Sequence, residues 1–297
     1  MELRVLEYFL AVAREQNITA AAESLHLSQP ALSRQLREME EKLGKQLLIR
    51  GVKGSRKVIL TEEGMILRRR AEEILSLVRR TENEITQSDE TIAGNVFIGT
   101  GETETVRLFA KVAKKLQQKY PDIRYNISSG NAEHVLEYLD KGLIDFGLLF
   151  TEIDSQKYEA IPVPIKDTWG VLMRKDSPLA EKEVIHPEDL WDKPLIVSHQ
   201  KGDDRYLNQW LQREESELHI VATYNLLFNA SLLVDEGLGY ALCYDKLINT
   251  KGSNLCFRPF SPGLEARGFI VWKKYQVFSK AANIFLQYLR ELLETEV

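Results

Sequence analysis

A polar helical face near the start of the chain carries residue types that bond to bases and phosphates. The segment SQPALSRQLREMEEKLG has apolar residues at helical spacings of four, three and four, namely Leu32, Leu36, Met39 and Leu43. The opposite side of such a helix would present Gln29, Pro30, Ser33, Arg34 and Arg37. Glutamine can bond adenine and arginine can bond guanine bidentately, while serine serves a base or a phosphate. The plain alternative is an ordinary solvated helix face.

The flanking residues predict where this helix begins and ends. Ser28 is a good N-cap, Pro30 suits a first turn, and Gly44 is typical of a C-terminal stop. Two further helices are expected before it. The first spans about residues 3–14, and the second starts at a Thr19 cap and runs to about Leu25. Three consecutive alanines in the second helix would let a neighbouring helix approach closely.

A basic hairpin is predicted after the third helix. Two short β-prone runs, residues 46–50 and 57–60, flank the segment GVKGSR. Residues 44–60 contain no acid, and their basic side chains are Lys45, Arg50, Lys53, Arg56 and Lys57. Three helices and such a hairpin form a winged helix-turn-helix, in which the third helix enters the major groove and the wing lies over flanking phosphates. A flexible basic loop is the alternative.

A long helix is expected to start at Thr61, with Glu62 and Glu63 at its positive end. It carries a heptad seam formed by Leu67, Ala71, Ile74, Val78, Thr81 and Ile85. Such a seam calls for a partner, which a second copy or the chain's own body can supply, and we expect a homodimer. The segment Ser88–Gly94 is predicted to be a linker.

Strand-like and helical segments alternate in the rest of the chain. The strand-like runs include NVFIGT, IRYNISS, IDFGLLF, GVLMRK, PLIVS, HIVATY, GYALCY and GFIVWKK, and a last helix is expected at about residues 278–294. This alternation predicts a mainly parallel sheet covered on both faces. Two clusters of such units indicate two α/β lobes.

Polar side chains stand near the ends of these runs, where open α/β sheets place their ligands. The candidates for a ligand site are Thr100, Thr103, Ser128, Ser129, His199 and Asn225. Together they would suit a small polar molecule, although serine and threonine at such positions also serve as helix caps. Glu102 and Glu104 would repel a carboxylate. We expect both to point outward and favour the helix dipole; alternatively, the ligand is neutral or cationic.

Composition excludes several other classes. The net charge of −5 falls on residues 91–297, which carry 24 basic and 29 acidic side chains. The hairpin is therefore a locally basic surface on an acidic protein, and it remains compatible with binding to nucleic acid. No signal peptide or membrane-spanning run is recognised, which predicts a cytoplasmic protein. Cys243 and Cys256 are 13 positions apart, without a CxxC motif or a nearby histidine cluster, and we expect two buried thiols in a reducing cytoplasm. Without nucleophile-elbow, P-loop or zinc-protease motifs, we expect no enzyme, metal or bound cofactor.

One family resemblance accounts for the whole pattern. Residues 3–61, with AAAESLHLSQPALSRQLREMEEKLGKQLLIR at their centre, resemble the DNA-binding domain of LysR-type transcriptional regulators. PLIVSH, LLVDEGLGYALCY and FLQYLRELL resemble parts of that family's effector domain, less specifically. The resemblance implies a winged helix-turn-helix at 1–60, a dimerising linker helix at 61–89 and a periplasmic-binding-protein-like α/β effector domain at 90–297. Its lobe I would be about residues 90–162 and 268–297, and its lobe II about residues 163–267.

The resemblance also implies partners and site residues. The expected partners are double-stranded promoter DNA, a small-molecule effector and further copies in a homodimer or homotetramer, with RNA polymerase as another candidate. Four residues fall where the family contacts operator DNA, namely Gln29, Pro30, Ser33 and Arg34. Arg50 takes the place of the family's arginine after the first wing strand, and Thr103 aligns with a Ser/Thr often used for the effector. Leu48 departs from the usual phenylalanine.

Overall fold

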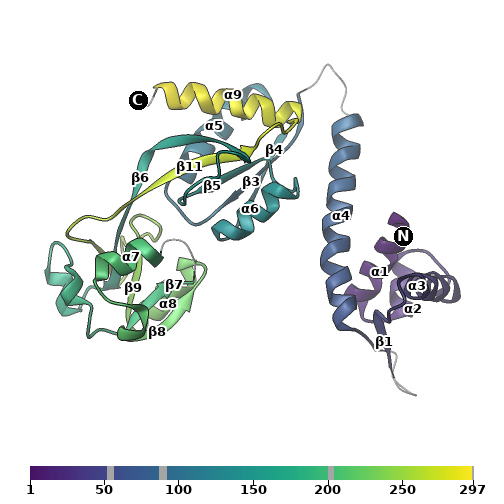
Figure 1. Cartoon of the computed structure of the whole chain (residues 1–297), viewed down its shortest axis with the longest axis horizontal. Helices are drawn as coiled ribbons and strands as arrows, with labels where there is room; N and C mark the ends of the chain where they lie inside the picture. The colour runs from purple at the N-terminus through teal and green to yellow at the C-terminus, as the bar shows by residue number, and fades with distance from the viewer. Residues whose placement is uncertain (52–56, 87–91, 200–203, 296–297) are drawn as a thin grey trace. The chain divides into compact units, whose positions relative to one another are not determined.

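The computed structural model describes residues 1–51, 57–86, 92–199 and 204–295. The chain forms two compact units, Met1–Thr86 and Gln87–Val297 (Figure 1). Most of the predicted linker lies outside the described residues, and its last residue, Gly94, opens a strand. Each unit has hydrophobic core clusters of its own.

The first unit contains three short helices, a hairpin and a long helix. They are α1 (Leu3–Glu15), α2 (Ile18–Ser24), α3 (Gln29–Leu43), β1 (Leu48–Arg50), β2 (Val58–Leu60) and α4 (Glu62–Thr86). β1 and β2 pair antiparallel, which confirms the predicted winged helix-turn-helix. One predicted cap is wrong: Asn17, not Thr19, caps α2, because the Asn17 side chain accepts the Thr19 N–H at 2.8 Å.

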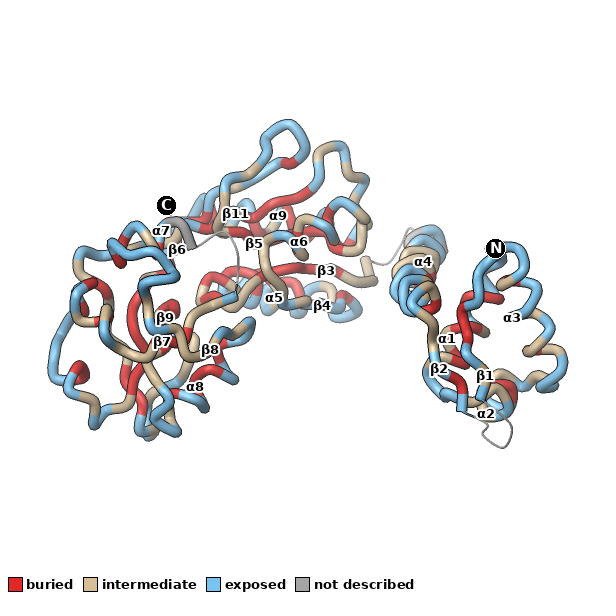
Figure 2. The backbone as a smooth tube through the Cα atoms, turned by 60° about the horizontal axis from the view of Figure 1, so that its bottom comes forward, coloured by how far each residue is buried: buried red, intermediate tan, exposed pale blue. Residues whose placement is uncertain are grey.

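One core joins α1, α2, α3, the hairpin and the first part of α4 (Figure 2). Phe9, Leu32, Leu36 and Leu48 are fully buried in it. The apolar stripe of α3 ends at Met39, since Leu43 is 44% exposed. The burial of one side of α3 leaves its other side to face outward.

The predicted seam of α4 divides into two parts. Thr61 caps the helix, its hydroxyl accepting a first-turn N–H at 3.0 Å. Leu67, Ala71 and Ile74 pack into the core of the first unit. Ile85, at the far end, is 77% exposed. The first half of the seam therefore holds the unit together, and the expectation of a partner helix applies to the second half.

The second unit is built on a nine-stranded sheet of order β4-β3-β5-β11-β6-β9-β7-β8, with β10 paired to β6. The strands are β3 (Gly94–Thr100), β4 (Ile123–Ser129), β5 (Phe146–Leu149), β6 (Tyr158–Arg174), β7 (Leu195–Ser198), β8 (Ile220–Tyr224), β9 (Tyr240–Tyr244), β10 (Leu255–Pro259) and β11 (Glu265–Lys273). The prediction of a mainly parallel sheet is wrong. β6 is antiparallel to β9, β10 and β11, and β11 is antiparallel to β5.

Helices cover both faces of each half of this sheet. α5 (Val106–Lys119) and α9 (Lys280–Thr295) share one core with β3–β5, and α6 (Ala132–Asp140) packs in another. α7 (Asp204–Leu211) and α8 (Leu227–Asp235) belong to separate clusters around β7 and β9. Short 3-10 turns occur at Pro178–Glu181, Pro187–Asp189 and Glu215–Glu217. The halves are the two predicted α/β lobes, joined where β6 runs beside β11 (Figure 1).

Candidate nucleic-acid interface and ligand pocket

The outward face of α3 presents the predicted polar residues in the predicted order. Ser28 begins the helix by accepting the Ala31 N–H at 3.4 Å. Gln29, Pro30, Arg34 and Arg37 are exposed and Ser33 is half-buried. The Arg34 side chain is 73% exposed, and its 3.9 Å approach to Glu38 is a loose contact. These side chains can therefore reach an external partner without breaking a strong internal contact.

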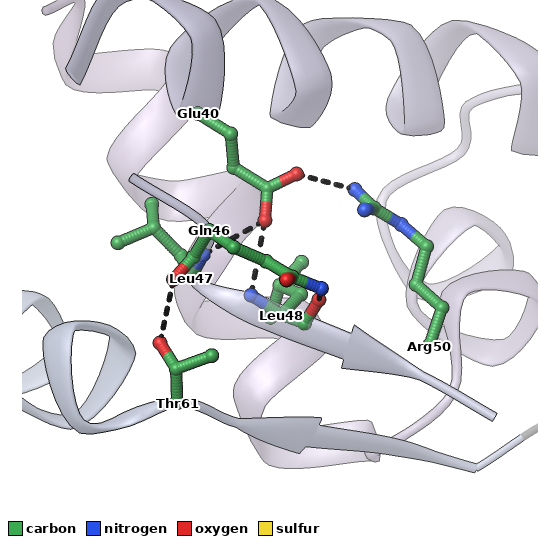
Figure 3. A network of polar contacts seen from close by, with 6 residues as sticks. All are labelled: Glu40, Gln46, Leu47, Leu48, Arg50 and Thr61. Atoms are coloured by element: carbon green, nitrogen blue, oxygen red, sulfur yellow. Dashed lines mark hydrogen bonds and ion pairs between the residues drawn. The ribbon is translucent and has the colours of Figure 1, made fainter. Parts of the chain in front are cut away.

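A largely buried carboxylate on α3 holds the root of the wing (Figure 3). Glu40 accepts the backbone N–H groups of Leu47 at 2.9 Å and Leu48 at 3.0 Å. It also pairs with the Arg50 guanidinium at 2.7 Å, where the two side chains are only 11% and 29% exposed. Sequence reasoning missed Glu40, because nothing local pairs a mid-helix acid with a strand that follows it.

The predicted wing residues differ in their contacts within the protein. Arg50 holds β1 against α3 through Glu40, so the structure gives it a positioning role in addition to any contact with DNA. Lys57 is exposed, and Lys45 contacts Glu63 at 3.2 Å. Lys53 and Arg56 lie outside the described residues. The described part of the first unit thus offers one polar helix face beside a basic hairpin.

A pocket of about 290 Å³ lies between the lobes of the second unit, and it collects half of the predicted ligand residues. Its lining residues are Gly101, Glu102, Ser129, Gly130, Asn131, His134, His199, Asn225 and Leu226. The predicted Ser129, His199 and Asn225 are among them. Asn131 and His134 were missed, although both follow the strand end that was identified. Asn131 caps α6 through the His134 N–H at 2.9 Å.

Three predicted ligand residues do not line this pocket. Ser128 precedes Ser129 on β4 and so faces the other side of the sheet. Thr100 is 2% exposed and its hydroxyl donates to the Gly101 carbonyl at 2.9 Å. Thr103 is 7% exposed and its hydroxyl donates to the carboxylate of Asp167. In this structure the Thr103 hydroxyl therefore makes an internal hydrogen bond and does not line the pocket.

Asp167 stands on β6 where the chain crosses between the lobes. It is 3% exposed, and its side chain meets the loop between β3 and α5 through Thr103. Burial of the carboxylate raises the pKa of Asp167, while the hydrogen bond from Thr103 opposes that rise. The Thr103–Asp167 contact thus anchors the loop that carries the pocket residues Gly101 and Glu102.

The expectation that Glu102 and Glu104 both point outward is wrong for Glu102. The carboxylate of Glu102 accepts the backbone N–H of Leu227, the first residue of α8, and lines the pocket. Glu104, which precedes α5, instead pairs with Arg107 in the first turn of that helix. The two lobes are therefore joined at the pocket by a carboxylate that sits at a helix N-terminus.

The cysteines and the other candidate metal ligands add no second site among the described residues. Cys243 and Cys256 are buried and are not joined in a disulfide, and burial raises the pKa of each thiol. Within the described ranges, no three His, Cys, Asp or Glu side chains could hold a metal ion, and no helix is long and apolar enough to cross a membrane.

A winged helix-turn-helix with an outward polar helix, attached to a two-lobed α/β unit with a pocket between the lobes, defines a ligand-responsive class of DNA-binding protein. Two family models match the chain accordingly. The bacterial regulatory helix-turn-helix protein, lysR family, matches residues 3–65, and the LysR substrate binding domain matches residues 89–294. The chain belongs to the LysR family, and it is a DNA-binding transcriptional regulator with an effector-binding domain.

Individual relatives agree with this assignment. The HTH-type transcriptional regulator YvbU of Bacillus subtilis is 24% identical over 298 residues, which cover 100% of both chains. The dual regulator OxyR of Escherichia coli is 33% identical over 198 residues, 66% of this chain and 63% of its own. The crystal structure of full-length CbnR with its target DNA covers 98% of this chain and 99% of its own at 19% identity, with a TM-score of 0.76. It shares the fold.

Proposed function

We propose that this regulator binds double-stranded promoter DNA as a homodimer or homotetramer. A small molecule bound between its lobes would change its promoter binding or its bending of the DNA. Residues 1–60 would read DNA, residues 61–89 would dimerise and residues 90–297 would bind the effector. The observation that carries the proposal is the division of α3. Leu32 and Leu36 are completely buried, whereas Gln29, Arg34 and Arg37 are exposed on the other side.

In this proposal the N-terminal part of α3 enters the major groove, which is about 12 Å wide and admits one helix. Gln29, Ser33 and Arg34 would contact base edges, with Pro30 close to the backbone at the helix start. Arg37 would bond phosphates, as would the wing residues Arg50, Lys53 and Arg56. The similar fold of CbnR, whose crystal structure is of a complex with its target DNA, supports DNA binding by a chain of this fold.

The effector part of the proposal rests on the pocket between the lobes. Glu102 and Ser129 come from one lobe, and His199 and Asn225 come from the other, so a bound molecule would touch both. A ligand shifts an equilibrium between lobe arrangements only by its difference in affinity for them. A tenfold change in output needs about 1.4 kcal/mol of such a difference. The exposed second half of α4 would carry this change to a partner copy, and RNA polymerase would respond to the altered promoter.

Selection of genomic DNA by the full-length protein tests the proposal. The protein should retain a small set of promoter fragments, and hydroxyl-radical footprints on them should show protected half-sites about one helical turn apart or a multiple of it. Sedimentation of the complex gives the number of copies bound. Retention of all fragments alike, with no footprint, would contradict promoter recognition.

A further inference from the structure

One anion-attracting group at the pocket, the N-terminus of α8, is already occupied by the chain itself. Helix N-termini attract anions through their unpaired N–H groups and their dipole. α8 begins at Leu227 with no side-chain cap from its preceding residue, Leu226. The Glu102 carboxylate accepts the Leu227 N–H from across the pocket. A carboxylate ligand would have to displace Glu102 or lie beside a like charge.

The other lining groups do not offset this negative charge with a fixed positive one. Among the described residues, the pocket is lined by no lysine or arginine, and Glu102 is its one carboxylate. Arg107, which follows Glu102 in the sequence, pairs with Glu104. His134 lies against the ring of Tyr138, with centroids 4.0 Å apart. Neutral imidazoles can donate one hydrogen bond and accept another, so they do not demand an anion.

The acceptors that remain are placed for a donor-rich ligand. Glu102 uses one oxygen for Leu227, and in the described chain its second oxygen has no hydrogen-bond partner. The hydroxyl of Ser129 and the amide of Asn225 stand in the same pocket, and both side chains are exposed. Ammonium and guanidinium groups carry several N–H donors and no acceptor, and their hydrogen bonds to a carboxylate are charge-assisted.

We propose that the pocket binds a small organic cation, whose ammonium or guanidinium group bonds the second oxygen of Glu102. This inference rests on the proposed effector function and names the class of its ligand. The volume of about 290 Å³ lies at the low end for ligand pockets, about 300–1000 Å³, which suits a compact molecule. Since Glu102 and Asn225 belong to different lobes, a cation that bonds both reinforces the existing contact between Glu102 and α8.

Matched probes of different charge test the proposal on the full-length protein. One set is putrescine, 1,4-butanediol and succinate, and the other is benzylamine, benzyl alcohol and benzoate. Thermal melting and calorimetric titration at millimolar concentration should show binding of at least one amine, with its alcohol and carboxylate counterparts binding at least tenfold more weakly. Stronger binding of the carboxylates, or no binding of either amine, overturns the proposal.

Two variants locate the effect. Glu102→Gln keeps an oxygen that can accept the Leu227 N–H but removes the charge, so the amine should bind at least tenfold more weakly. Glu104→Gln makes the same change in charge two residues away, at a side chain outside the pocket lining, and should bind the amine like the unchanged protein. Equal affinity of the amine for the Glu102→Gln variant and the unchanged protein also overturns the proposal.

Failure of the proposed ligand class can be distinguished from failure of the proposed regulator function. Selection of promoter fragments needs no ligand, so it can succeed while the amines fail. If a carboxylate binds and changes the footprint, the effector pocket stands and the assigned ligand class falls.

Discussion

The Arg50 guanidinium and the Glu40 carboxylate form an ion pair of 2.7 Å that joins the end of β1 to α3. The same carboxylate accepts two backbone N–H groups of the segment leading into β1. The wing is thus fixed to the helix expected to enter the major groove. Their relative position is set by the fold before any DNA is met, which lowers the cost of ordering both elements on binding.

Loss of the Glu40 carboxylate should loosen this junction. Glu40→Ala leaves two N–H groups without their acceptor and Arg50 without its counter-charge, so we expect a loss of about 2–4 kcal/mol in the free energy of unfolding of the first unit. Hydrogen exchange of a peptide covering residues 45–50 measures it. Glu38→Ala is the control, since Glu38 makes a loose contact with Arg34 at 3.9 Å and accepts a long hydrogen bond from Gln35 at 3.4 Å, both on the exposed side of α3. Exchange as slow as in the unchanged protein would show that Glu40 is dispensable.

Arg34 should contribute directly to base recognition. Arg34→Ala removes a side chain that is 73% exposed, so folding should be little affected. If the guanidinium reads a base, binding to a selected promoter should weaken by about 1–3 kcal/mol and discrimination at one position should relax. Gel shifts on the promoter and its single-base variants measure both. Arg14→Ala is a matched loss of charge on α1, where the side chain is 68% exposed, and should leave affinity near normal.

Arg56 should act through charge alone. Arg56→Ala is expected to weaken binding to all sequences alike, because phosphate contacts carry no sequence information. The slope of log affinity against log salt should become shallower by about 0.9, because the variant neutralises one phosphate fewer. Titrations of full-length protein with promoter and unrelated duplexes over a salt series measure this. A change confined to one sequence would assign Arg56 to base reading instead.

Local rules predicted the DNA-binding unit well from sequence. The Ser28 cap, Pro30 in the first turn and Gly44 at the end bracket α3 as expected, because capping depends on neighbours in the chain. The same locality explains why the role of Glu40 was missed, since its partners lie up to ten residues away in a separate element. The prediction for the α4 seam was incomplete for a similar reason. Its heptad spacing does not reveal that α1 packs on the first half of the seam.

The pocket between the lobes could be predicted only in part. Strand ends are visible in sequence, and three of the residues chosen from them line the pocket, namely Ser129, His199 and Asn225. Thr103 was chosen by the same rule, but its hydroxyl bonds a carboxylate 64 positions away on a crossing strand. Glu102 bonds an N–H 125 positions away. Such pairings follow from how the lobes meet, which strand patterns do not encode.

Thr103 should stabilise the effector domain. Its hydroxyl donates to buried Asp167 and accepts the Thr105 N–H at 3.0 Å, so Thr103→Val leaves both without that partner. We expect a loss of about 1–3 kcal/mol in the free energy of unfolding. Urea unfolding followed by tryptophan fluorescence reports on this unit, because all four tryptophans belong to it. Thr103→Ser keeps the hydroxyl and should recover most of the loss. Equal losses in the two variants would assign the effect to the methyl group.

Asp167 should make the stability of the effector domain depend on pH. Burial raises the pKa of Asp167 above its ordinary value of 3.8, so the folded protein holds this proton more tightly than the unfolded chain. The stability that the protonated carboxyl contributes is full below the unfolded pKa and is lost as pH rises through the folded pKa. Asp167→Asn keeps an acceptor for Thr103 and cannot ionise.

The free energy of unfolding of Asp167→Asn, relative to that of the unchanged protein, should therefore rise as the pH increases from about 4 through the raised pKa of Asp167. Urea titrations with tryptophan fluorescence across this range measure the difference. Asp192→Asn is the control: the Asp192 side chain is 77% exposed, and its hydrogen bond with Lys193 lowers its pKa, so its difference should have the opposite sign and be small. A pH-independent difference for Asp167→Asn would mean that the carboxyl titrates as it does in the unfolded chain.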